Sequence, residues 1–111
     1  MITRHAIFAG MLVAAAAVTA GGAANAPSMS VNWVEVNGDQ DDCVKQASRA
    51  VKANNFGTRF EVISNRTIYG ERGAYTAAVR CVADKSIAFV AVAGPDSGNT
   101  EKYASGIRDA F

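Results

Sequence analysis

Two cysteines, Cys43 and Cys81, are the only thiols in the 111-residue chain, and their most direct chemistry is a disulfide bond. The pair would close a loop of about 39 residues, for which the chain-entropy treatment gives roughly 3.5–4 kcal/mol of stabilisation. Two free buried thiols or an intermolecular bridge are the alternatives. We predict the intramolecular disulfide, which would fasten an early helix to a later strand.

Covalent catalysis finds little support in the side chains that are present. The only histidine, His5, belongs to an N-terminal segment that we expect to be removed, so serine and cysteine nucleophiles would lack their usual base. A carboxylate pair such as Glu61 and Glu71 could support a hydrolase, but the spacing of these residues in the sequence does not indicate a catalytic pair. We therefore expect no enzymatic activity, no catalytic residues and no cofactor, and a carboxylate hydrolase is the least favoured alternative.

Two segments approach known binding motifs and fail at specific positions. Residues 37–42 resemble the start of an EF-hand calcium loop, but Asp42 stands where glycine is required and Ser48 where a bidentate glutamate is required. Helix capping explains these acids, so no metal site is expected. Residues 94–102 lead from a strand to a helix without the Walker A ending. What remains in this segment is the start of a predicted helix, a candidate anion-binding turn made of Ser97, Gly98, Asn99 and Thr100.

The best candidate for a functional surface is a group of arginine and tyrosine side chains around a predicted hairpin turn at 70–73. Both residue types are enriched at recognition hot spots because they combine large contact area with directional donors. Arginine on an exposed strand face also serves solubility and edge protection, which is the plainer interpretation. The candidate residues are Arg59, Arg66, Tyr69, Arg72 and Tyr75.

Residues 1–26 have the layout of a secretory signal peptide, with a basic start, an apolar run at 6–18 and a tail of small residues. The apolar run is shorter than the roughly 20 residues of a membrane-spanning helix, so we expect no stable membrane insertion. Cleavage after Ala24 or Ala26 would place a single domain, residues 27–111, in the periplasm or outside the cell, where thiols are oxidised.

Removal of residues 1–26 takes Arg4 from eleven basic residues and nothing from ten acidic ones, which leaves ten of each. A neutral chain has no long-range field that collects polyanions, so nucleic-acid binding is not expected. The remaining chain of about 85 residues can form only one small core, and a covalent staple commonly supports such a core.

Hydrophobic periodicity indicates the elements that position these residues. Alternation predicts a first strand at 31–36 with Trp33 as a core or rim anchor. An amphipathic helix begins at the N-cap Asp39 and ends before Gly57, which we expect in the left-handed position. Asn99 or Thr100 is expected to cap a final helix. The strands predicted between the helices are 59–69, with an irregularity at 65–66, then 75–81 and 87–93, the last a central strand covered on much of both faces.

This order predicts an α+β fold, β-α-β-β-β-α, with an antiparallel sheet of about four strands and two helices on one face. We expect a small exported binding domain whose partner is an envelope or secreted protein, and the oligomeric state is left open. The alternative is a carrier of a small ligand or anion, with a pocket at Arg80, Tyr75 or Tyr103.

Overall fold

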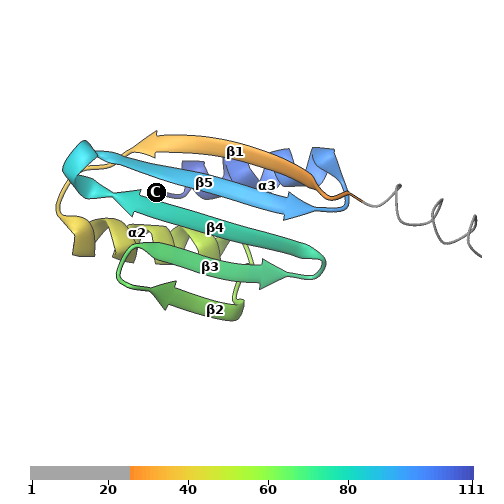
Figure 1. Cartoon of the computed structure of the whole chain (residues 1–111), viewed down its shortest axis with the longest axis horizontal. Helices are drawn as coiled ribbons and strands as arrows, with labels where there is room; N and C mark the ends of the chain where they lie inside the picture. The colour runs from red at the N-terminus through yellow and green to blue at the C-terminus, as the bar shows by residue number, and fades with distance from the viewer. Residues whose placement is uncertain (1–25) are drawn as a thin grey trace, which may run out of the picture.

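Residues 26–111 are the part of the chain that the computed structural model describes, so the predicted signal peptide lies outside the described residues except for its last position. The described chain has the predicted α+β fold, shown in Figure 1. Its elements are β1 (Ser28–Glu35), α2 (Gln40–Ala53), β2 (Thr58–Ile63), β3 (Thr67–Arg72), β4 (Tyr75–Val82), the 3-10 helix η1 (Ala83–Lys85), β5 (Ile87–Gly94) and α3 (Ser97–Asp109).

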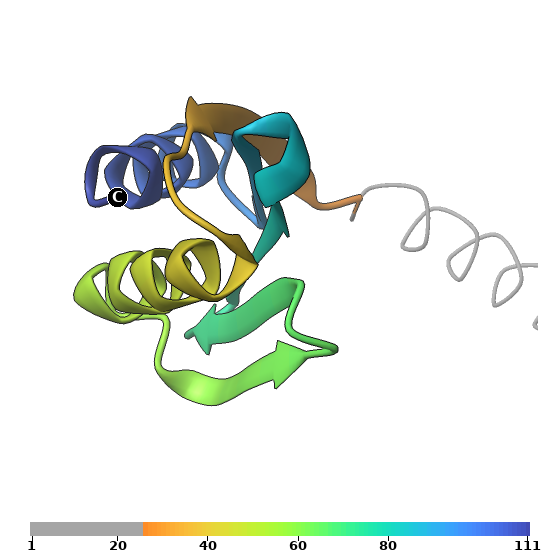
Figure 2. The same cartoon turned by 90° about the vertical axis from the view of Figure 1, so that its left-hand side faces the viewer.

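The five strands form one antiparallel sheet in the order β1-β5-β4-β3-β2. Figure 2 shows α2 and α3 together on one side of this sheet, as predicted. Helix α3 packs mainly on β1 and β5, and helix α2 on β3 and β4. No helix within residues 26–111 has both the length and the apolar composition needed to cross a membrane.

The predicted count of about four strands is corrected to five, because the extended run at 59–69 is a hairpin. Ser64 and Asn65 have φ angles of 53° and 50°, and the Arg66 N–H donates to the Ile63 carbonyl at 3.0 Å. Positive φ at both central residues is the turn geometry that lets two antiparallel strands follow one another directly. The irregularity predicted at 65–66 is therefore a chain reversal.

Helix α2 begins as predicted at the N-cap Asp39. The Asp39 carboxylate accepts from the Asp42 N–H at 2.9 Å, and the Asp42 carboxylate accepts from the Asp39 N–H at 3.1 Å. This reciprocal capping box satisfies backbone donors that the first turn leaves free. The acidic cluster is thus accounted for by the start of the helix, and the described residues contain no group of three His, Cys, Asp or Glu arranged to hold a metal ion.

The prediction that Gly57 takes the left-handed position after α2 is wrong. Asn55 does so, with φ 66°, and its N–H donates to the Lys52 carbonyl at 3.0 Å. The Phe56 N–H donates to the Val51 carbonyl at 3.1 Å, which completes a Schellman motif. Asparagine can take this position because its short side chain tolerates the left-handed region.

The prediction that Asn99 or Thr100 caps α3 is also wrong. Asp96 is the N-cap, and its carboxylate accepts from the Asn99 N–H at 2.9 Å. The helix therefore begins at Ser97, two residues before Asn99, because the N-cap side chain reaches the third N–H of the helix.

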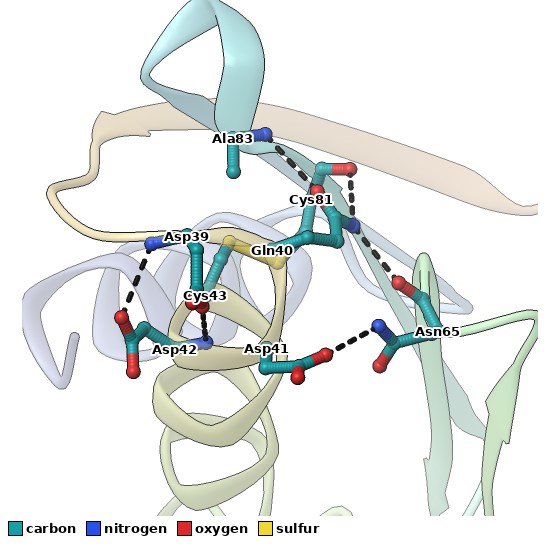
Figure 3. The surroundings of a disulfide bond; sticks show 8 residues. All are labelled: Asp39, Gln40, Asp41, Asp42, Cys43, Asn65, Cys81 and Ala83. Carbon is teal, nitrogen blue, oxygen red and sulfur yellow. Dashed lines mark hydrogen bonds between the residues drawn. A yellow bond between two sulfur atoms is a disulfide. The ribbon is translucent and has the colours of Figure 1, made fainter.

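The disulfide between Cys43 and Cys81 is confirmed, and it joins the first turn of α2 to the end of β4 (Figure 3). The two Cα atoms are 6.0 Å apart, and the residues are 0% and 3% exposed. The disulfide is part of the hydrophobic core between the helices and the sheet. The other core residues are Val36, Val44, Ala47, Ala50, Val51, Phe56, Ile68, Ala77, Val79, Ala88, Val90, Val92, Ala104 and Ile107.

Candidate interaction surfaces

Strand β1 turns two polar side chains, Ser30 and Asn32, toward helix α3 and three apolar side chains, Met29, Val31 and Trp33, toward solvent. The Ser30 hydroxyl hydrogen-bonds the Thr100 hydroxyl of α3 at 2.8 Å, and the Arg108 guanidinium of α3 donates to the Asn32 side-chain carbonyl at 3.3 Å. Both β1 residues therefore face α3. Since side chains alternate along a strand, the residues between them face the opposite side of the sheet.

The outward residues of β1 are large and strongly exposed: Met29 at 69%, Val31 at 74% and Trp33 at 54%. A shift of the register by one residue would turn these side chains toward the helix and the polar ones outward. The fold keeps the arrangement that exposes them. Trp33 is therefore not the core or rim anchor that the sequence predicts.

Strand β5 continues this apolar surface. Phe89 lies opposite Trp33 and is 50% exposed, and Ala91 lies opposite Val31. The prediction that β5 is covered on much of both faces is wrong, because the described chain covers only its helix side. We use the name open face for the part of the sheet side turned away from the helices that is formed by Met29, Val31, Trp33, Ala78, Arg80, Phe89, Ala91 and Ala93. Glu35, Tyr69, Thr76, Val82 and Ile87 lie around it on the same side of the sheet.

Sequence reasoning missed the open face, although a signal for it was present. Serine and asparagine alternate with Met29, Val31 and Trp33 along β1, so one side of this strand had to be apolar. The alternation alone predicts that the apolar side points inward. Only the packing of α3 on Ser30 and Asn32 shows that it points outward.

The five arginine and tyrosine candidates do not form one surface. Arg72 and Tyr75 surround Tyr103 of α3, with the Arg72 guanidinium 4.3 Å from the ring centre and the Tyr75 ring edge-on at 5.2 Å. Both therefore brace the helix against the sheet. Tyr69 lies between buried Ile68 and Gly70 on β3, so it faces the other side of the sheet.

The two remaining arginines lie elsewhere. Arg59 forms a salt bridge of 3.4 Å with Glu71, one of the two carboxylates that the hydrolase alternative would use. Arg66 lies after the β2–β3 turn and lines a cavity at the disulfide end of the sheet. The five residues are thus distributed over the helix side of the sheet (Arg72 and Tyr75), its opposite side (Tyr69), the edge strand β2 (Arg59) and one end of the domain (Arg66).

The predicted anion-binding turn is the first turn of α3. The Asn99 side chain donates to the Tyr75 hydroxyl at 3.1 Å, and the buried Thr100 hydroxyl bonds both Ser30 and the Ser97 carbonyl. The Asp96 carboxylate occupies the N-cap, where its charge would oppose a bound anion. Packing within the chain accounts for these polar groups.

A cavity of about 780 Å³ opens at the disulfide end of the sheet. Arg66 and Arg80 line it, and neither takes part in the salt bridges formed among residues 26–111. Asp39 and Asp84 line it as well, so the cavity carries charges of both signs. The pocket expected from Arg80 with Tyr75 or Tyr103 is not formed, because Arg80 lies on the open face and the two tyrosines lie on the helix side. The other lining residues are Gly38, Gln40, Ser64, Asn65, Cys81, Val82 and Ala83.

Gln40 holds this end of the domain together. Its side-chain amide donates to the carbonyls of Asn65 at 2.9 Å and Cys81 at 3.1 Å, and its oxygen accepts from the Ala83 N–H at 3.2 Å (Figure 3). One side chain thereby joins the start of α2 to the β2–β3 turn and to the end of β4. Asp41 adds a second link, because its carboxylate accepts from the Asn65 amide at 2.7 Å.

The substitution Gln40→Glu is expected to lower the free energy of unfolding by about 1–2 kcal/mol. It keeps the shape of the side chain but replaces the NH₂ donor with an oxygen facing two carbonyls. A negative charge in the first turn of a helix is favourable by about 0.3–1 kcal/mol, which offsets only part of this loss. Urea unfolding followed by circular dichroism measures the change. Gln46→Glu on the same helix is the control, and equal losses in the two variants would contradict the bridging role.

A scan of protein-family models finds no match to this chain, and a search of curated protein sequences finds no significant match. The open face and the cavity are therefore the two structural features that bear on function.

Proposed function

We propose that this chain is a small exported, non-enzymatic interaction domain that binds a partner protein through the open face. The observation that carries the proposal is the row of exposed apolar side chains on β1 and β5, from Met29 at 69% to Phe89 at 50%. Contiguous exposed apolar surface marks interaction sites on proteins that otherwise fold as compact domains. The Cys43–Cys81 disulfide supports export, because such bonds persist in oxidising compartments.

The proposed surface differs from the one expected from the sequence. Trp33 and Phe89 provide adjacent aromatic anchors on it, and aromatic residues are enriched among the side chains that dominate binding energy. Arg80 lies beside Phe89 and supplies a directional donor on the same face. An apolar centre with a polar neighbour is the usual composition of a protein–protein interface.

Affinity capture from envelope extracts, with the exported protein as bait, tests this function. We expect the wild-type protein to enrich a partner reproducibly and Val31→Glu to lose it, because an unpaired carboxylate would be buried in the contact. Val62→Glu is the matched control. Val62 is 41% exposed but lies opposite Ile68, whose side chain is buried on the helix side.

Retention of the same partner by Val31→Glu would show that the open face is not the binding site. Failure to enrich any protein, together with a small molecule that co-purifies with the bait, would favour the carrier alternative and the cavity at Arg66 and Arg80.

A further inference from the structure

Strand β5 is covered by the helices on one side and uncovered on the open face. Residues 87–93 contain no polar side chain, a composition typical of strands that are covered on both faces. Val90 and Val92 are buried under the helices, whereas Phe89 on the other side is half exposed. The composition of β5 therefore indicates that a second layer covers the open face.

The shape of the open face suits a second copy of itself. Met29, Val31 and Trp33 form a ridge of large side chains along β1. Beside Val31 the side chains are small, since Ala91 lies opposite Val31 and Ala78 lies opposite Ala91, whereas Phe89 and Arg80 continue the row of Trp33. A copy rotated by 180° about an axis along β5 places Val31 of each copy over Ala78 of the other, so a large side chain meets a small one in both halves of an isologous dimer.

Charge also permits self-association. Residues 27–111 carry ten basic and ten acidic side chains, so two copies do not repel each other through net charge. Trp33, Phe89 and Arg80 lie in one row across β1, β5 and β4. A two-fold axis along β5 therefore brings Arg80 of one copy to Trp33 of the other, where the guanidinium can stack on the indole ring.

The area of the overlap is sufficient for a weak dimer. With the axis along β5, strands β1, β5 and β4 of each copy overlap. Three adjacent strands have a width of about 14 Å, and eight residues of a strand have a length of about 26 Å. Each copy then contributes a flat area of about 370 Å², which the protruding side chains increase. The total buried surface is on the order of 1,000 Å², the size at which specific interfaces begin.

We propose that the open face binds a second copy of this chain, with β1 of each copy lying over β4 of the other. This rests on the proposed function, because it names the partner protein of the same face. Pairing through the free edge of β1 would leave Phe89 and Ala91 uncovered, so face-to-face packing is the arrangement that covers the apolar side of β5.

Analytical ultracentrifugation of the purified exported protein tests the dimer directly. We expect the mass to rise from one copy to two between about 1 and 100 µM, the range suited to a small interface. Trp33 is the only tryptophan, so its fluorescence reports on the open face alone. Its emission is expected to move to shorter wavelength over the same concentrations, because the ring leaves water.

Val31→Glu is expected to raise the dissociation constant at least about tenfold, because it places an unpaired carboxylate in the contact. Val62→Glu should leave the constant unchanged, and circular dichroism confirms that both variants fold. A protein that stays monomeric at 100 µM, a dimer that Val31→Glu does not weaken, or a Trp33 emission that stays constant would each overturn the dimer. These outcomes leave the proposed function to be decided separately, by the loss or retention of a captured partner in Val31→Glu.

Discussion

Removal of both cysteines, as Cys43→Ala together with Cys81→Ala, is expected to lower the free energy of unfolding by about 3.5–4 kcal/mol. The bond spans a sequence separation of 38 residues, so it removes much of the conformational freedom of the unfolded chain. Domains of this size have only about 5–15 kcal/mol of total stability, so the loss is a large fraction of it. Alanine is suitable because both residues are buried and leave no polar group unpaired.

Urea unfolding of the oxidised wild type, the reduced wild type and the double variant measures this loss. Reduction keeps both sulfur atoms and removes only the covalent link, so it separates the cross-link from the lost side-chain volume. We expect reduction to account for most of the change. A double variant that unfolds at the same urea concentration as the oxidised wild type would contradict the stabilising role of the bond.

Phe56→Ala is expected to lower the free energy of unfolding by about 3–5 kcal/mol. Phe56 is fully buried directly after α2, and its ring packs edge-on against Tyr103 of α3 at 5.6 Å. The Phe56 backbone lies directly against Gly70, because a Cβ atom added at Gly70 would overlap the Phe56 carbonyl oxygen. The surrounding chain therefore cannot easily collapse into the space that the ring leaves. Part of the cavity therefore remains and adds to the cost.

Phe60→Ala removes the same ring from a partly buried position and serves as the control. Phe60 lies on β2 under the Lys52 ammonium group, 4.3 Å from the ring centre, at the margin of the core. We expect less than half the loss, measured by urea unfolding under the same conditions. Equal losses at the two positions would show that Phe56 is not the anchor of this end of the core.

These two substitutions act at opposite ends of α2. The disulfide and Gln40 attach its first turn to the end of β4, and Phe56 attaches the segment after its last turn to α3 and β3. Because both ends are held, the strands under α2, β3 and β4, are rigidly positioned. Strand β4 also carries Ala78 and Arg80 of the open face, so this part of the open face is expected to keep its arrangement in the free protein.

Local chemistry made some features of the fold predictable. Asp39 is a strong N-cap whose effect depends on the next three residues, and the structure places it as predicted. The β2–β3 hairpin was missed because its turn uses Ser64 and Asn65, without the glycine that usually marks this turn geometry. The cap of α3 was missed because Asp96 was assigned to the preceding loop, although its carboxylate reaches the third N–H of the helix.

The sequence by itself determined the α+β fold class, the order of most elements and the disulfide, because periodicity, capping and the presence of only two cysteines are properties of the chain alone. Only the tertiary structure decided which side of β1 and β5 meets the helices. Alternation divides a strand into two sides but does not say which one is covered. Helix α3 settles this by bonding Ser30 and Asn32, and Trp33 and Phe89 are therefore exposed on the open face.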